Sequence, residues 1–239
     1  MTGSKLIAIH QPTFFSWLGF FDKIFRSDIF VILDSVQFPK TGGFWVNRTK
    51  VLIGDTEHWL TIPVKRNYTG TKKINEMEIN NSTAWQEKNI KTIDINYRKA
   101  PHFDLVFPLI KELLEYKTES ICEYDLNITY RMCDLFGIDK SKMIRSSSIA
   151  YEGNATDMLV SITKLLEGNA YMCGGGASNY QEDEKFEAAG IKLIYQDFKH
   201  PVYPQFNSKV FIPGLSIIDS LMNLGVDGVK NLISGDRKI

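Results

Sequence analysis

The stretch KLIAIHQPTFFSWLGFFDKIFRSDIFVILD, residues 5–34, decides the fold. It opens with a hydrophobic strand pattern at residues 5–9, places apolar side chains at helical spacing over 18–26, and is continuously apolar again at 29–33. A strand, a short helix and a second buried strand are typical of a βαβ unit, with two parallel strands and a right-handed crossover. The sequence therefore predicts an α/β fold built around a mostly parallel sheet.

The rest of the chain adds crossover helices, a β-hairpin and a helical insertion to this unit. NRTKVLIGDTEHWLTIPV, residues 47–64, predicts the hairpin, with Gly54 and Asp55 at its turn. INEMEIN, residues 74–80, alternates apolar and polar side chains and predicts a further strand. We expect a single domain over residues 1–239, with the helical insertion at about residues 82–140.

Capping and terminating residues delimit the expected helices. These cover residues 85–97 after a cap at Ser82 or Thr83, 103–116, 120–136 closed by Gly137, 154–168 after a cap at Asn154, 180–189 closed by Gly190, and 215–225 closed by Gly225. After residues 143–145 the alternation resumes, and further strands are expected at 170–173 and 191–198. Strands and helices therefore alternate again in the last third of the chain.

The composition is that of an ordinary globular protein and argues against several functional classes. Lys plus Arg is 28 and Asp plus Glu is 28, so no global field favours general nucleic-acid binding. The three cysteines, Cys122, Cys133 and Cys173, are widely spaced, which favours a reducing compartment over a disulfide framework or a zinc site. We find no signal-peptide pattern and no apolar run near the roughly 20 residues of a membrane span. We therefore expect a soluble cytoplasmic protein, and its oligomeric state stays open.

Polar side chains gather where predicted strands end, and the crevice beyond the carboxyl ends of strands is the usual ligand site of open α/β sheets. We expect one such crevice to collect four clusters. His10, Asp34 and Cys173 are the catalytic candidates, and the other members are substrate-binding candidates. The clusters are His10, Gln11 and Trp17; Asp34, Gln37, Lys40, Trp45, Asn47 and Arg48; Cys173, Gly174, Gly175, Ser178, Asn179 and Tyr180; and His200, Tyr203 and Gln205, followed by Asp219.

Each cluster also has a purely structural interpretation. Asp34 could cap the turn that follows it, and Trp17 and Trp45 could be core residues. Arg48 could be an ordinary surface arginine or an anchor for a carboxylate or phosphate. The four histidines show no HxxxH or HExxH spacing and no CxxC is present, so no metal site is predicted. A GxSxG nucleophile turn is also missing from the sequence.

The glycine loop that begins at Gly174 follows a predicted strand and opens a helix, as a phosphate cradle does. It matches neither GxGxxG nor GK[ST], and the QEDE run at 181–184 competes with a bound phosphate. The loop can instead let backbone approach a ligand closely. Cys173 stands at the turn into this loop, where a thiol pKa can be lowered, but the same acidic run opposes that effect. A nucleophilic role and a pocket-lining role both stay open.

Several segments of the chain resemble the WbqC-like protein family, in the family's order. The HQP turn and the aromatic turn with glycine that follows it are the most specific part. At Cys173 the sequence departs from the family, whose members more often carry serine or another small residue there, which argues against a cysteine nucleophile. The segments are AIHQPTFFSWLGFFDKI, SDIFVILDSVQFPK, FWVNRTKV, HWLTIPV, YMCGGGASNY, and HPVYPQF with LSIIDSLMNLG.

The resemblance implies a bacterial protein of surface-polysaccharide or nucleotide-sugar gene clusters, such as those for O-antigen and lipopolysaccharide. It suggests transfer of an acyl or glycyl group to the amine of a nucleotide-linked amino sugar. In that reaction His10 would be the base and Asp34 would orient it. Arg48 and Lys40 would hold phosphate. The base or sugar ring would stack on Trp17, Trp45 or Tyr180. The sugar hydroxyl groups would be bound by Gln11, Gln37, Asn47 and Gln205.

Two other functions stay open. The first βαβ unit faintly resembles the HxGH turn of adenylyl-transferring enzymes, which suggests ATP-dependent activation of a carboxylate, although the second histidine is missing. A non-catalytic sugar-binding subunit is the other alternative. The donor is accordingly left open among acyl-CoA, an aminoacyl donor and ATP, and consumption of ATP would distinguish the ligase from the transferase.

Overall fold

A five-stranded parallel sheet is the centre of the computed structural model, which describes residues 4–40, 45–175, 181–206 and 208–235. Its strand order is β5-β2-β1-β6-β7, and every neighbouring pair is parallel. The mostly parallel α/β fold is therefore confirmed. The strands are β1 (Leu6–His10), β2 (Ile29–Ile32), β5 (Met143–Arg145), β6 (Ala170–Cys173) and β7 (Lys192–Tyr195).

The first βαβ unit has the predicted form. Helix α1 (Leu18–Arg26) connects β1 to β2, and His10 of β1 is in register with Ile32 of β2. The chain then leaves β1 towards β2 and β5, and later returns to the other side of β1 at β6. The strand order thus reverses between β1 and β6, and the loops after these two strands diverge. A crevice is expected at this reversal point.

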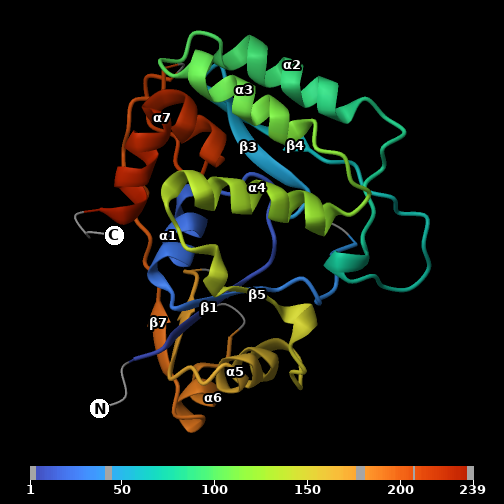
Figure 1. Cartoon of the computed structure of the whole chain (residues 1–239), viewed down its shortest axis with the longest axis vertical. Coiled ribbons are helices and arrows are strands. Elements are labelled where there is room, and N and C mark those ends of the chain that lie inside the picture. Colours follow the sequence, from blue (N-terminus) through green and yellow to red (C-terminus); the bar gives the residue numbers. More distant parts are fainter. Residues whose placement is uncertain (1–3, 41–44, 176–180, 207, 236–239) are drawn as a thin grey trace.

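The central strand β1 is buried on both faces. Ile7 and Ile9 pack into a core with α5 (Ala155–Leu165) and α6 (Asp183–Ala188), whereas Ala8 packs into the larger core on the opposite face. Figure 1 shows α5 and α6 on one side of the sheet and α1 and α4 (Ile121–Phe136) on the other. Burial on both faces explains why β1 and β2 are almost wholly apolar in sequence.

The remaining elements cover the larger core. The predicted hairpin forms from β3 (Arg48–Ile53) and β4 (Thr56–Thr61). The span of the expected insertion contains α2 (Trp85–Tyr97), α3 (Phe103–Leu114) and α4, and Gly137 ends α4 in the left-handed conformation, with a φ of 70°. Three short 3₁₀ turns are η1 (Ile74–Glu76), η2 (Lys140–Lys142) and η3 (Ser146–Ser148), and the last helix is α7 (Ile217–Ser234). Organisation as a single domain stays a prediction.

Two predicted features near residues 74–85 are wrong. Residues 74–80 form the turn η1 followed by isolated bridges, because the buried Ile74 and Met77 are three residues apart, a spacing that suits a 3₁₀ turn. Helix α2 begins after Ala84 without a side-chain cap. Ser82 does not cap it, because its hydroxyl donates to the nearby Asn80 side chain at 2.7 Å.

Several helix ends also differ from the prediction. At Gly225 the chain has φ 69° and ψ 179°, and a side chain there would meet the ring of His102. The helix resumes beyond this kink to Ser234, because Val229 and Ile233 add a second buried face. Asn154 precedes α5 but makes no side-chain cap bond. The sixth predicted helix was expected from residue 180, which lies outside the described residues, and α6 itself begins at Asp183.

We predict that Asp125→Asn stabilises the protein at neutral pH. Asp125 lies in α4, is fully buried, and has no hydrogen-bond partner for either carboxylate oxygen within the described residues. Burial raises its pKa well above the ordinary value, so the folded state holds the protonated acid. Asp125 therefore does not reduce the free energy of unfolding below the unfolded-state pKa of about 3.9. It reduces that free energy progressively as pH rises above this value. Chemical denaturation should show a gain of about 1–3 kcal/mol at pH 7 that disappears near pH 4.

Asp134→Asn on the same helix is the matched control. Its carboxylate is half exposed and pairs with Lys140 at 2.6 Å, so removing the charge should change stability by less than about 1 kcal/mol. An Asp125→Asn variant that is less stable than the parent at every pH would contradict a protonated, unpartnered Asp125.

Candidate functional site

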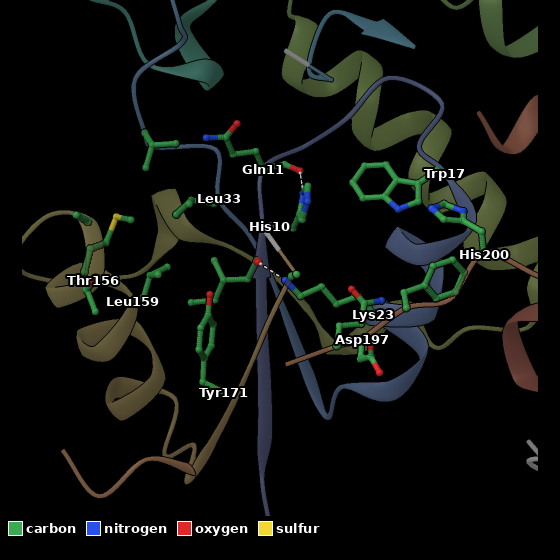
Figure 2. A pocket seen from close by; sticks show the side chains of 18 residues that line it. His10, Gln11, Trp17, Lys23, Leu33, Thr156, Leu159, Tyr171, Asp197 and His200 are labelled. Atoms are coloured by element: carbon green, nitrogen blue, oxygen red, sulfur yellow. Dashed lines mark hydrogen bonds between the residues drawn. The ribbon is translucent and has the colours of Figure 1, made fainter. Parts of the chain in front are cut away.

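A cavity of about 860 Å³ opens at the carboxyl ends of β1 and β6, where the strand order reverses. Figure 2 shows that its walls come from β1, α1, α5 and the segment that follows β7. Predicted candidates that line it are His10, Gln11, Trp17, Gly174, Gly175 and His200. Polar or aromatic lining residues that were not singled out from sequence are Lys23, Thr156, Tyr171, Gln196, Asp197 and Phe198.

Backbone strain concentrates around this pocket. Among the described residues that are not glycine, four have positive φ, and two of them, Ala155 (45°) and Asp197 (44°), line the pocket. A third, Phe15 (40°), lies in the turn from β1 to α1. Such conformations cost of order 1 kcal/mol or more and cluster at binding and catalytic sites. The pocket is therefore the strongest candidate for a functional site.

The aromatic turn after β1, HQPTFFSW, is fixed by hydrogen bonds from two elements, the hairpin and the start of α7. The carbonyl of Phe15 accepts hydrogen bonds from Thr49 Oγ1 at 3.1 Å and from Ser216 Oγ at 2.8 Å. Thr49 belongs to the hairpin and Ser216 caps α7, so both elements fix the strained turn. Gly19 then allows close packing, because a side chain there would meet Trp17 and Phe198 within 3 Å. The turn thereby sets the position of Trp17 on the pocket wall.

His10 is a neutral imidazole with one nitrogen available. Its Nδ1 lies 2.8 Å from the backbone oxygen of Gln11, and since a carbonyl only accepts, Nδ1 carries the proton. Nε2 then keeps its lone pair. Loss of hydration, and to a smaller extent the positive charge of Lys23, lower the pKa of His10 to about 4, against the opposite effect of the bond to Gln11. His10 is therefore unprotonated at neutral pH.

Lys23 is a buried lysine on the inner face of α1. Its side chain is 3% exposed, and Nζ donates to the carbonyl of Ile9 at 3.0 Å (Figure 2). Burial lowers the pKa of Lys23 to about 8, against a smaller opposite effect of Cys173. The sequence held little signal for this residue, because the nine-residue α1 also carries Asp22 and Arg26 and a lysine beside them is ordinary.

Hydrogen bonds attach the segment after β7 to α1 and complete the wall. Gln196 Nε2 donates to the carbonyl of Gly19 at 2.6 Å and to Asp22 Oδ2 at 2.9 Å. His200 lies farther along this segment, and its Nδ1 accepts from the backbone N–H of Gly214 at 3.3 Å. Burial lowers the pKa of His200 below its ordinary value. This wall therefore offers a second unprotonated imidazole at neutral pH.

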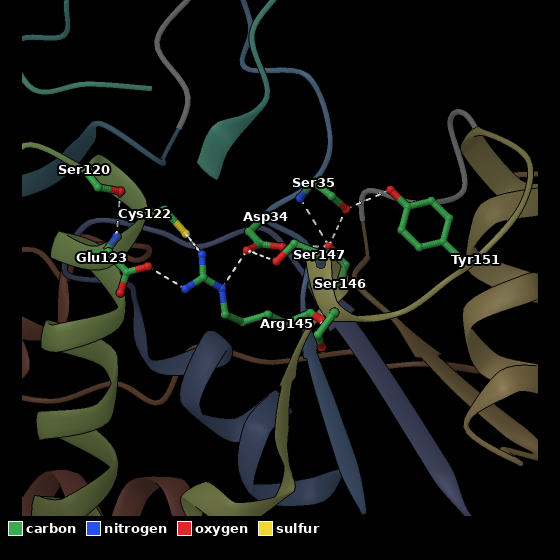
Figure 3. Close-up of polar contacts among 10 residues, drawn as sticks. Asp34, Ser35, Ser120, Cys122, Glu123, Arg145, Ser146, Ser147 and Tyr151 are labelled. Atoms are coloured by element: carbon green, nitrogen blue, oxygen red, sulfur yellow. Dashed lines mark hydrogen bonds and ion pairs between the residues drawn. The ribbon is translucent and has the colours of Figure 1, made fainter. Parts of the chain in front are cut away.

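The hydrogen bonds of Asp34 go to groups other than His10. Its buried carboxylate accepts hydrogen bonds from Arg145 Nε at 2.7 Å, from Ser147 Oγ and N at 2.8 and 2.9 Å, and from Ser146 Oγ at 3.0 Å. Figure 3 shows this cluster. Burial raises the pKa of Asp34, but these bonds outweigh it and the pKa is lowered. The pairing of β2 with β5 brings Arg145 to the end of β2. Asp34 thus fixes the scaffold beside the pocket.

The other members of the second cluster also lie outside the pocket lining. Gln37 and Lys40 are exposed, and Asn47 is buried with its amide donating to Ile62 O at 3.1 Å. The Arg48 guanidinium lies over the Trp59 ring at 3.9 Å. Trp45 approaches the pocket only through its contact with Trp17, at 5.3 Å between ring centroids. Folding of the hairpin away from the sheet separates these residues from His10.

The third and fourth clusters divide between the pocket and the core. Cys173 is 1% exposed, donates to Ile194 O at 3.6 Å and is not among the lining residues. Burial raises its thiol pKa, against the effect of Lys23. Tyr203 and Gln205 donate instead to the buried Asp219, at 2.7 and 3.1 Å, away from the pocket. Ser178, Asn179 and Tyr180 lie outside the described residues.

Neither a metal site nor a membrane-spanning helix is found in the part of the chain that the structure describes. No group of three or more His, Cys, Asp or Glu side chains among those residues is arranged to hold a metal ion. Within the same residues, every helix is too short or too polar to cross a bilayer.

Comparisons with known proteins give a family and a distant relative. The model of the WbqC-like protein family matches residues 11–231. The chain is also 26% identical over 225 residues to "Uncharacterized protein Rv1507c" of Mycobacterium tuberculosis (strain ATCC 25618 / H37Rv), a match that covers 93% of this chain and 95% of that protein. No solved structure matches the chain.

We predict that Arg145→Met destabilises the protein by about 2–3 kcal/mol at pH 7, because it leaves a buried carboxylate with serine donors only. The lowered pKa of Asp34 means that this stabilisation is present above the unfolded-state pKa and is lost as pH falls through the folded-state pKa. Urea denaturation should therefore show the difference shrinking below about pH 4. Arg131→Met, an exposed substitution on α4, is the control and should stay within about 0.5 kcal/mol of the parent. Equal losses in both variants would contradict the role given to Arg145.

Proposed function

This chain belongs to the WbqC-like protein family, and we propose that it transfers an acyl or aminoacyl group to the amine of a nucleotide-linked amino sugar. One observation carries the proposal: a neutral imidazole, His10, lines a pocket at the reversal point of a parallel sheet, with Nε2 left as an acceptor. A sugar amine first loses its ammonium proton to solvent, and the neutral amine then sheds a second proton as its nitrogen attacks a carbonyl. A neutral histidine is the side chain that most often takes such a proton.

The proposed reaction is one acyl transfer. The amine nitrogen attacks the carbonyl carbon of the donor, so that a C–N bond forms and the bond from that carbon to the leaving sulfur or oxygen breaks. The proton of the amine passes to His10 Nε2 and from there to the leaving group. Because Nδ1 stays bonded to the carbonyl of Gln11, the imidazole keeps one orientation through this exchange.

The remaining walls suit a sugar ligand. A volume of about 860 Å³ falls in the range of pockets that bury a small organic molecule. Trp17 and Phe198 offer aromatic faces for stacking on a base or sugar ring. Thr156 and Asp197 supply a hydroxyl and a carboxylate for sugar hydroxyl groups.

A transfer assay tests the proposal directly. The purified protein is incubated with UDP- and dTDP-linked amino sugars and with acyl-CoA or aminoacyl-tRNA, with and without ATP, and the products are weighed by mass spectrometry. An N-acylated sugar formed without ATP supports the transferase. Formation that requires ATP and releases AMP or ADP supports a ligase, and saturable binding of the sugar without turnover supports a binding subunit.

We predict that His10→Ala lowers the rate of transfer by roughly 10²–10⁴ and leaves the fold intact. The imidazole is only partly buried, so the melting temperature should change by a few degrees at most. His58→Ala on the exposed face of β4 is the matched control and should keep full activity. Unchanged activity per folded molecule in His10→Ala would exclude His10 as the base.

We also predict that Cys173→Ser keeps activity within about tenfold of the parent. The thiol is buried behind the pocket lining with a raised pKa, so it is not positioned as a nucleophile. Serine has nearly the same volume and can donate the same bond to Ile194 O. A loss beyond a thousandfold, together with an acyl group trapped on Cys173 of the parent, would instead indicate a covalent thioester.

A further inference from the structure

Lys23 is buried and forms no ion pair with any residue that the structure describes. Of the lysines and arginines that the structure describes, it alone lines the pocket. Its ammonium group has a backbone carbonyl as hydrogen-bond partner, and none of the ion pairs formed by the described residues includes it. A buried ammonium group destabilises the folded protein unless an opposite charge accompanies it. The pocket therefore contains a positive charge that no carboxylate among the described residues pairs with.

Lys142 is a partly buried lysine of the same protein that has acidic side chains nearby, and it can be compared with Lys23. Its Nζ donates to the carbonyls of Phe25 and Ser27 at 3.2 and 2.8 Å. The nearby Asp139 and Asp28 supply negative charge, and Lys142 does not line the pocket. Burial lowers the pKa of both lysines, so burial alone does not distinguish Lys23. Lys23 differs from Lys142 because it lines a cavity and because no carboxylate among the described residues pairs with it.

We propose that Lys23 binds the anionic group of the ligand, which in the function proposed above is the phosphate of a nucleotide sugar. The inference rests on that function for the identity of the ligand, and it moves the phosphate contact from Arg48 and Lys40 to Lys23. Arg48 lies over Trp59 and Lys40 is exposed, and neither lines the pocket. Lys23 has the position that they lack.

The surroundings of Lys23 favour an anion. Helix α1 starts beside Trp17 with no side-chain cap and no acidic residue in its first turn, so its positive end stays uncompensated. Gly174 and Gly175, which also line the pocket, leave open space beside their backbone. Asp197 is the one carboxylate among the described lining residues, and it is exposed.

An anion at Lys23 also acts on His10. The titratable groups that face Lys23 are His10 from β1 and Cys173 from β6, and the pocket adds Tyr171, Asp197 and His200. The positive charge of Lys23 contributes to the low pKa of His10. A bound phosphate offsets that charge and raises the pKa of His10, which makes the imidazole a stronger base. Ligand binding would therefore prepare the base for the proton it receives.

Sulfate is a suitable first probe, because its charge does not change between pH 6 and 10. Its dissociation constant is measured by thermal shift at constant ionic strength, with chloride as the reference anion and pyrophosphate as a second probe. We expect binding that is constant below the Lys23 pKa of about 8 and weakens roughly tenfold per pH unit above it. In the same titration, added sulfate should move the NMR titration of the His10 ring to higher pH.

Lys23→Met keeps the length of the side chain and removes its charge, so it should weaken sulfate and pyrophosphate binding at pH 7 by tenfold or more. Lys142→Met is the matched control and should bind both anions within about twofold of the parent. If Lys23→Met binds them as tightly as the parent, or if neither anion binds the parent, the inference is overturned. The pH dependence in the parent gives the same answer without any substitution.

The two proposals fail separately. If anion binding depends on Lys23 but the protein transfers no acyl group, the proposed anion site is supported and the proposed transferase activity is refuted. Acyl transfer to a nucleotide-linked sugar that neither sulfate nor pyrophosphate inhibits, with equal rates in the parent and Lys23→Met, refutes the anion site and keeps the transferase.

Discussion

The central strand β1 imposes the constraint on which the rest of this structure depends. It pairs in parallel with β2 on one edge and with β6 on the other, and both of its faces are buried. Parallel pairing brings the carboxyl ends of all three strands to the same edge of the sheet, while the reversal of strand order sends their loops apart. A pocket at the end of β1 is therefore a consequence of topology. His10 lines it because it is the residue at which β1 ends.

Two charged groups near this edge are used in opposite ways. Asp34 is buried and receives bonds from Arg145, Ser146 and Ser147, so its charge is satisfied within the scaffold. Lys23 is also buried, and among the described residues its hydrogen-bond partner is a single carbonyl, that of Ile9. A buried charge that is fully hydrogen-bonded holds its neighbours in one geometry. A buried charge without a counter-ion has a shifted pKa or binds a ligand of opposite charge. This contrast, more than the presence of polar residues, separates scaffold from candidate site.

The same distinction applies to the C-terminal segment. Asp219 is buried and accepts bonds from Tyr97, Tyr203 and Gln205, which joins α7 to α2 and to the chain that follows β7. Burial raises the pKa of Asp219, and the three donors oppose that shift. His200, which lies three residues before Tyr203 in the sequence, lines the pocket. Neighbours in sequence thus serve different purposes because an irregular segment points successive side chains in unrelated directions.

The sequence by itself determined the first βαβ unit and most of the local elements, because burial on both faces produces an apolar run that needs no distant information, but it did not determine the turn at 74–80 or every helix end. It also indicated His10, Gln11, Trp17, Gly174 and Gly175 as residues at strand ends. It did not determine which polar groups are already paired: Asp34 meets Ser146 across 112 positions and Tyr97 meets Asp219 across 122. Lys23 was hidden for the reverse reason, since a lysine in a helix is ordinary until the packing around that helix is known. Only the tertiary structure decided these roles, because the state of a polar side chain depends on its partners and its access to water, and both are set by long-range contacts.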